Sequence, residues 1–206
     1  MPTYDEWDQR TADLLEAAYV AAGAGPGGSG SGDLTEGGWR AKRQHLAVPF
    51  DRDGDWLDVG CANGHLMATL PGWVAERGPE IEPFGLELLP TVAELARTTF
   101  PHLADRIWAG SAMSWTPPRR FDFVTVLEDC VPPVELKAMV KRMFDEFVSP
   151  GGRLIVSSYA NRDVAPRPLF DELAAHGFAP DGRIHIDRPG RFSLVTAWID
   201  HPDKKD

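Results

Sequence analysis

The feature that most constrains the fold is a strand that ends in a glycine-punctuated turn and leads directly into a helix. It spans residues 56–66 and reads Trp-Leu-Asp-Val-Gly-Cys-Ala-Asn-Gly-His-Leu. Glycine lets the backbone come close to a ligand because it has no side chain to block the approach. The helix that follows begins with unpaired N–H groups, which suit polar or anionic ligand atoms. We therefore expect a ligand to lie against this turn.

A second strand-like run, residues 83–87, ends in the acidic residue Glu87. In nucleotide-binding folds, an acidic residue about 20 residues beyond a glycine turn hydrogen-bonds the ribose hydroxyls. The turn and Glu87 together predict a nucleoside-binding site.

The composition narrows the class of protein and of partner. The chain has 206 residues, a length that is enough for one domain with a substantial core. Its formal net charge is −10. An acidic surface repels polyanions and argues against nucleic acid as a partner. The acidic N-terminus lacks an apolar signal core, and no run is apolar enough for a membrane helix. Because Cys61 and Cys130 are not in a metal-like spacing, we expect a cytoplasmic, metal-free protein.

The chain divides into a short N-terminal part, residues 1–32, and a main domain, residues 33–206. The apolar spacing predicts a helix over Tyr4–Ala22. Residues 23–32 are mostly Gly and Ser, which is typical of a flexible tether. The helix is then a lid over the site, a packing arm for a second subunit, or a loosely docked terminal helix. The first two possibilities leave a monomer or a homodimer open.

The main domain alternates strands and helices, which predicts an α/β fold with a parallel sheet covered on both faces. A hairpin near Pro189-Gly190 would add an antiparallel strand at the edge. We expect Pro71 to kink or end the helix that begins near His65, because proline lacks an N–H and clashes with the preceding turn. The expected strands are residues 55–59, 82–87, 106–109, 121–127, 153–158, 184–186 and 192–200, and the expected helices after the first strand are residues 65–71, 90–99, 134–148 and 168–176.

These motifs resemble, in order over residues 39–200, those of class I S-adenosylmethionine-dependent methyltransferases. Residues 58–64 match the family's acidic residue followed by Gly-x-Gly-x-Gly, with Ala62 in place of the middle glycine. Glu87 matches the ribose-binding acid. Residues 110–112 fall where the family has Gly-Asp-Ala, and Ser111 replaces the aspartate that contacts the adenine amine. Residues 121–124 and 150–155 match the fourth-strand motif and the turn into the fifth strand.

The resemblance implies a Rossmann-like doubly wound sheet of seven strands, mostly parallel with one antiparallel edge strand. It also implies S-adenosylmethionine as methyl donor and S-adenosylhomocysteine as product. Leu88 and Met113 are expected to sandwich adenine, and Arg40 and Arg43 are candidates for binding the methionine carboxylate. The residues expected to contact the cofactor are Trp39, Arg43, Asp58, Gly60, Cys61, Ala62, Gly64, Glu87, Leu88, Ser111, Ala112, Met113 and Glu128. More narrowly, three segments, residues 37–43, 58–64 and 115–122, resemble a group of small bacterial methyltransferases of unassigned substrate.

The acceptor side is expected to follow the fourth strand. Methyl transfer from a sulfonium is an in-line displacement, so the protein mainly has to position donor and acceptor. Glu128 or Asp129 could take a proton from an acceptor or bind its amine, and Tyr159 could form part of the acceptor wall. The alternative for Asp129 is an acid that complements the dipole of the next helix.

Two other functions are alternatives to methyl transfer. A nicotinamide dehydrogenase would want Gly-x-Gly-x-x-Gly, whereas Ala62 and His65 stand at the second and third glycines. A protein that binds the cofactor without turnover fits the loss of aspartate at Ser111 and the lack of an evident base. Charge and chain length favour a small molecule as acceptor, and a protein or RNA acceptor stays open.

Overall fold

The computed structural model describes residues 4–29, 35–161, 167–188 and 192–202. Two compact units make up the chain, Met1–Thr116 and Pro117–Asp206. The glycine turn and Glu87 belong to the first unit, whereas Glu128, Asp129 and Tyr159 belong to the second.

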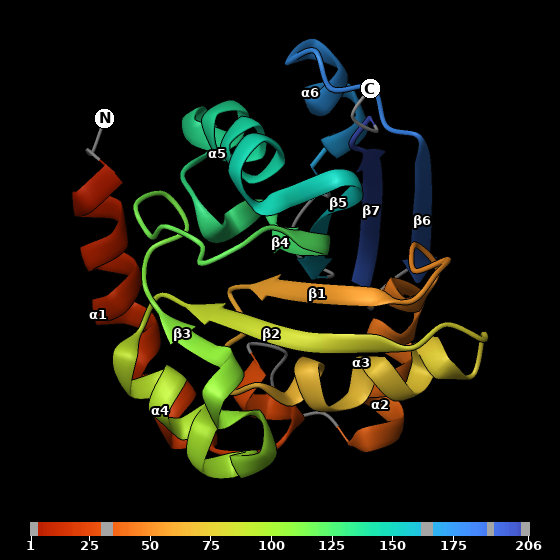
Figure 1. Cartoon of the computed structure of the whole chain (residues 1–206). Helices are drawn as coiled ribbons and strands as arrows, with labels where there is room; N and C mark the ends of the chain where they lie inside the picture. Colours follow the sequence, from red (N-terminus) through yellow and green to blue (C-terminus); the bar gives the residue numbers. More distant parts are fainter. Residues whose placement is uncertain (1–3, 30–34, 162–166, 189–191, 203–206) are drawn as a thin grey trace. The chain divides into compact units, whose positions relative to one another are not determined.

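The first unit carries three parallel strands with helices between them. Its elements are α1 (Tyr4–Ala22), η1 (Pro26–Ser29), α2 (Glu36–Arg43), η2 (Gln44–Ala47), β1 (Gly54–Val59), α3 (His65–Ala75), β2 (Ile81–Glu87), α4 (Pro90–Thr99), η3 (Pro101–Arg106) and β3 (Ile107–Ala109). β2 pairs in parallel with β1 on one side and with β3 on the other. Figure 1 shows α3 and α4 along the same face of these strands.

The second unit holds the other four strands within the described residues. Its elements are β4 (Phe121–Leu127), η4 (Glu128–Cys130), η5 (Pro133–Glu135), α5 (Leu136–Arg142), η6 (Met143–Phe147), β5 (Val148–Asn161), α6 (Leu169–Ala175), β6 (Gly182–Arg188) and β7 (Phe192–Asp200). β4 and β5 are parallel, whereas β7 runs antiparallel to both β5 and β6. The turn expected at Pro189-Gly190 lies outside the described residues.

The strand order is β3-β2-β1-β4-β5-β7-β6 in a seven-stranded sheet. This order confirms the predicted doubly wound α/β fold, mostly parallel with antiparallel pairing at one end. In such a fold, ligands bind beyond the carboxyl ends of the strands, which is where the turn after β1 and Glu87 at the end of β2 lie.

The helix α3 does not end at Pro71, because it continues to Ala75. A proline inside a helix costs about 3 kcal/mol. The residues beyond Pro71 include Trp73 and Val74, which are buried. Burying a large apolar side chain contributes roughly 1.5–3 kcal/mol, so packing of these two side chains offsets the lost hydrogen bond.

The predicted helix over residues 134–148 is too long. Its α-helical part is α5, followed by the π-helical turn η6, and β5 already begins at Val148. Val148 pairs with Phe121, and the next pair is Phe123 with Arg153, so the predicted Pro-Gly-Gly turn forms a bulge inside the strand. The bulge is closed by hydrogen bonds from the Gly151 N–H to the His201 carbonyl and from the His201 N–H to the Gly152 carbonyl.

The core of the first unit supports the turn after β1. Cys61 packs in a buried cluster with Met67 of α3 and with side chains of α4 and β3. Gly85 of β2 makes this packing possible, because a Cβ there would lie 2.5 Å from the Met67 sulfur and 2.7 Å from the Cys61 sulfur. A side chain at this position would displace both the turn and α3.

Candidate cofactor site

The turn between β1 and α3, residues 60–64, is called the glycine loop below. Three of its residues have left-handed backbone, with φ of 82° at Gly60, 49° at Ala62 and 78° at Gly64. The N–H groups of Gly60 and Cys61 donate to the Leu86 carbonyl at 2.7 and 3.1 Å. The loop is thus hydrogen-bonded to β2, and Ala62 adopts a conformation that usually requires glycine.

Glu87 lies against the glycine loop at the end of β2. It is 7% exposed, and its Oε2 accepts a 2.8 Å hydrogen bond from the Ala62 N–H. Its Oε1 accepts one from the Leu89 N–H at 3.0 Å. Burial raises the pKa of Glu87, and these backbone hydrogen bonds oppose the rise. A carboxylate at this position can accept further hydrogen bonds from ligand hydroxyls next to the loop.

The segment after β3 is tied to the same strand end. The Gly110 N–H donates to the Glu87 carbonyl at 2.8 Å. Ser111 accepts from Met113 through its hydroxyl at 3.3 Å and from Trp115 through its carbonyl at 2.9 Å. Ala112 is buried and Met113 is half-buried. The Ser111 hydroxyl therefore stabilises the turn of residues 111–115, at the position where the family that the sequence resembles has an aspartate.

The remaining predicted cofactor residues of the first unit differ in exposure. Asp58 is buried in β1 next to the glycine loop, and Leu88 is half-buried directly after Glu87. Trp39 of α2 is 1% exposed, and its indole N–H donates to the Thr69 hydroxyl of α3 at 3.1 Å. The Arg43 guanidinium lies over the Trp39 ring at 5.3 Å. Trp39 thus packs between α2 and α3, and the expected contacts of Trp39 and Arg43 with a cofactor stay predictions.

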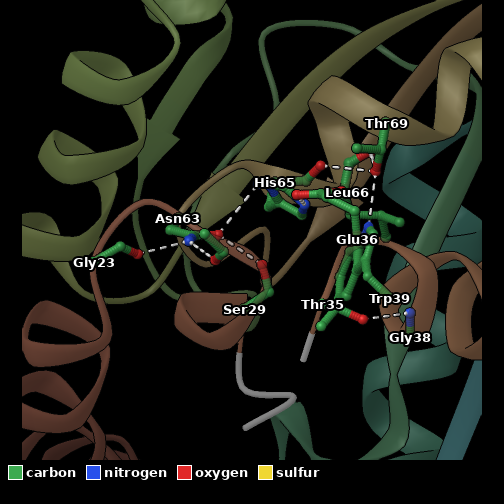
Figure 2. A network of polar contacts seen from close by, with 11 residues as sticks. Gly23, Ser29, Thr35, Glu36, Gly38, Trp39, Asn63, His65, Leu66 and Thr69 are labelled. Carbon is green, nitrogen blue, oxygen red and sulfur yellow. Dashed lines mark hydrogen bonds and ion pairs between the residues drawn. The ribbon is translucent and has the colours of Figure 1, made fainter. Parts of the chain in front are cut away.

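Asn63 is a residue of the glycine loop whose role sequence reasoning missed. It is fully buried, and its amide N–H groups donate to the Gly23 and Gly25 carbonyls at 2.9 Å each (Figure 2). Its side-chain oxygen accepts from the Ser29 hydroxyl at 2.6 Å and from the His65 N–H at 3.2 Å. Because its partners are mostly distant backbone groups, nothing in the sequence identifies them.

His65 begins α3 beside this network. Its Nε2 lies 3.6 Å from a carboxylate oxygen of Glu36, and its ring meets Trp39 edge-on at 5.1 Å. Burial lowers the pKa of His65, whereas the nearby Glu36 carboxylate opposes this shift. A neutral imidazole at the start of a helix is consistent with packing, and the geometry assigns it no proton transfer.

In the second unit, Glu128 is held in an ion-pair network. It is 6% exposed; one oxygen accepts from the Ser158 hydroxyl at 2.7 Å, and the other is ion-paired with Arg167. Arg167 also pairs with Glu172 at 2.6 Å. Both oxygens of Glu128 are therefore already engaged, whereas Asp129 is exposed and Tyr159 is half-buried.

The described residues carry neither a metal-binding cluster nor a membrane-spanning helix. No group of three or more His, Cys, Asp or Glu residues in this part of the chain could hold a metal ion. Over the same residues, no helix has both the length and the apolar character needed to cross a membrane. Cys61 and Cys130 are both free thiols.

Comparisons with known proteins agree with this geometry. Residues 34–198 match the model of a family described as a methyltransferase domain. A curated relative, trans-aconitate 2-methyltransferase of Methylobacterium radiotolerans, is 30% identical over 132 residues, which cover 63% of this chain and 47% of the relative. The chain thus spans about half the length of that relative.

Two solved structures illustrate the shared fold. The [4+2]-cyclase SpnF is 15% identical with a TM-score of 0.63, and the alignment covers 98% of each chain. Magnesium protoporphyrin IX methyltransferase of Synechocystis PCC 6803, solved with bound S-adenosylmethionine, is 13% identical with a TM-score of 0.62, covering 98% of this chain and all of the other.

Proposed function

The chain belongs to the methyltransferase domain family, and on that premise we propose that it transfers a methyl group from S-adenosylmethionine to a small-molecule acceptor. The observation that carries the proposal is the Glu87 carboxylate next to the glycine loop, bonded to the Ala62 N–H at 2.8 Å. A buried acid at the end of β2 suits the two ribose hydroxyls of a nucleoside cofactor. Each of its oxygens has a second lone pair for such a bond.

The first unit offers groups for the rest of the cofactor. The glycine loop brings backbone close enough for the methionine and ribose parts to pass over it. Leu88 and Met113, which are half-buried, supply apolar side chains for the adenine. Ser111 has no carboxylate for the adenine amine, so we expect backbone groups of residues 111–113 to make that contact.

The chemistry asks little of the protein beyond positioning. A sulfonium carries its own leaving group, and holding the methyl carbon in line at ~3–3.5 Å from the acceptor atom can supply ~7–11 kcal/mol. We propose Glu128, Asp129 and Tyr159 for the acceptor side. The ion pair of Glu128 with Arg167 suits a role in holding the acceptor region better than a role as proton acceptor. Asp129 is the more exposed carboxylate of the two.

The acceptor class rests on charge and on the names of relatives. The net charge of −10 disfavours nucleic acid. The relatives named above act, by their names, on trans-aconitate and on magnesium protoporphyrin IX, which are small molecules. A protein or RNA acceptor is the alternative that an acceptor screen must include.

A second candidate function is cofactor binding without methyl transfer. The similarity of this chain to SpnF favours this candidate, because a protein named as a cyclase shares the fold. Fold alone does not choose the chemistry. Tight binding of S-adenosylmethionine, with no S-adenosylhomocysteine formed over a panel of carboxylic acids, phenols, amines, peptides and RNA, would favour this candidate.

Calorimetric titration of S-adenosylmethionine and S-adenosylhomocysteine tests the proposal, with NADH as the control ligand. We expect micromolar binding of both compounds and at least tenfold weaker binding by Glu87→Ala. Glu82→Ala is the matched control, since Glu82 lies on the same strand and pairs at the surface with Arg106; it should bind as the unmodified protein does.

Certain results of the calorimetric titration would contradict the proposed function. Binding of neither S-adenosylmethionine nor S-adenosylhomocysteine, or a preference for NADH, would overturn the proposal. If Glu87→Ala does not fold, Glu87→Gln replaces it, because the amide keeps one acceptor for the Ala62 N–H and loses the charge. Equal affinity of Glu87→Gln and the unmodified protein would remove Glu87 from the site.

A further inference from the structure

The segment before α2 contacts the glycine loop through Asn63. Residues 23–29 supply three of the four hydrogen bonds of the Asn63 side chain, from two carbonyls and one hydroxyl. The fourth joins the same side chain to the first N–H of α3, at His65. Both donors and both acceptor positions of the buried amide are thereby satisfied.

The contact is built into the backbone of the segment. The helix α1 ends at Ala22, and Gly23 follows with left-handed φ of 69° and an N–H bonded to the Tyr19 carbonyl at 3.1 Å. The turn η1 then places Gly28 against the amide, where a Cβ would lie 2.0 Å from the Gly23 carbonyl oxygen and 2.6 Å from the Asn63 nitrogen. Only glycine fits this position without a shift of the segment or the loop.

The segment is also anchored on its other side. The Thr91 hydroxyl of α4 donates to the Glu16 carboxylate of α1, and α1 packs along α4. Figure 2 shows the 23–29 segment reaching Asn63 from one side, with α3 and Trp39 on the other. The glycine loop is thus held between a segment fixed to α1 and the start of α3.

Asn63 stands between the two loop residues that matter most for a ligand. Its predecessor Ala62 bonds Glu87, and its successor Gly64 turns the chain into α3. If the 23–29 segment left, a buried amide would lose three partners and would have to move toward water. That movement would shift Ala62 relative to Glu87, and with it the ribose position.

We propose that residues 23–29 are a positioning segment for the cofactor site, which fixes the glycine loop through Asn63 and so sets the affinity for the cofactor. The segment lies outside residues 34–198, which match the family model. The inference rests on the proposed function, because it concerns the same cofactor. By linkage, a cofactor that binds better when the segment is docked must also strengthen the docking.

The test compares Gly28→Ala with Gly37→Ala. The first variant places a Cβ against Asn63, whereas a Cβ at Gly37 of α2 meets nothing within 4 Å. We expect Gly28→Ala to bind S-adenosylhomocysteine at least tenfold more weakly in calorimetry, and Gly37→Ala to bind within twofold of the unmodified protein. Ser29→Ala should weaken binding and Ser29→Thr should restore it, since threonine keeps the hydroxyl that bonds Asn63.

Hydrogen exchange gives a readout that a purely structural role would not move. Saturating S-adenosylhomocysteine should slow exchange of the Gly28 N–H, which bonds the Gly25 carbonyl, and this protection should be lost in Ser29→Ala. Equal affinity of folded Gly28→Ala, or no ligand effect on residues 23–29, would overturn the inference. If Gly28→Ala does not fold, the Ser29 pair decides. Absence of binding by the unmodified protein would instead refute the proposed function.

Discussion

Replacing Gly64 by alanine tests the glycine loop at the N-cap of α3. Gly64 has φ of 78°, and an added Cβ would lie 3.2 Å from a ring carbon of Phe100 and 3.3 Å from the Cβ of Ala96. The substitution therefore introduces both a left-handed alanine and a tight contact with the buried face of α4. Both effects lower the free energy of unfolding.

The magnitude follows from three contributions. A left-handed L residue costs ~1–2 kcal/mol, and forcing extra volume into a packed core costs ~1–3 kcal/mol. Alanine recovers ~0.4–1 kcal/mol by reducing the entropy of the unfolded chain. The sum is a loss of roughly 1–5 kcal/mol, and each kcal/mol lowers the melting temperature of a chain of this size by about 2–4 °C.

Urea unfolding followed by circular dichroism measures the loss, with two other glycines as references. Gly177→Ala shares the left-handed φ, at 90°, without any crowding, so it should lose only roughly 0–1.6 kcal/mol. Gly72→Ala lies inside α3 with open space around the Cβ and should gain roughly 0.5–1 kcal/mol. A Gly64→Ala protein as stable as Gly177→Ala would refute the packing of the loop on α4.

Three further changes have defined outcomes. Burial raises the pKa of Glu87 above 4.5. Between pH 4.5 and the raised pKa, the folded chain therefore holds a proton that the unfolded chain has lost, and the contribution of Glu87 to the free energy of unfolding falls as pH rises. Urea unfolding at several pH values should show a smaller fall for Glu87→Gln. Arg167→Met leaves the buried Glu128 without its cation and should cost ~3 kcal/mol, part of which Glu128→Gln should restore in the double variant. Cys61 is buried and its pKa is raised, so iodoacetamide should label Cys61 of the folded protein far more slowly than Cys130. Peptide mass spectrometry measures the two labelling rates, and equal rates would mean that the glycine loop opens.

Much of the fold could be predicted because local signals mark where elements begin and end. Phe121–Leu127 and Pro90–Thr99 have the bounds that the sequence predicts, since an apolar run or a proline at the first helical position fixes them. The start of β5 could not be predicted. Val148 continues the apolar spacing of the preceding helix, and only its pairing with Phe121 across the bulge makes it a strand residue.

The candidate site shows the same division between local and distant causes. Glu87 could be found from its spacing to the glycine loop, because the spacing is set by a strand, a turn and a helix of ordinary length. The contacts of Asn63 could not, because its partners are carbonyls of Gly23 and Gly25, and a carbonyl is present at every residue. The ion pair of Glu128 with Arg167 could not be predicted either, because the sequence offers many other acidic residues and arginines that could form ion pairs.

The glycine loop tolerates alanine at its middle position because its neighbours hold it there. A left-handed Ala62 costs ~1–2 kcal/mol, whereas its N–H donates to the buried Glu87 carboxylate, and a hydrogen bond to a charged group contributes ~1.5–3 kcal/mol. The next residue, Asn63, is held in place by four hydrogen bonds of its side chain. The conformation that glycine would permit is here imposed by contacts, so the loop depends on Glu87 and Asn63 more than a glycine-rich loop would. Ala62→Gly should therefore make the protein less sensitive to loss of the Asn63 contacts. If Gly28→Ala lowers the urea midpoint as much in the Ala62→Gly background as in the unmodified protein, this account is wrong.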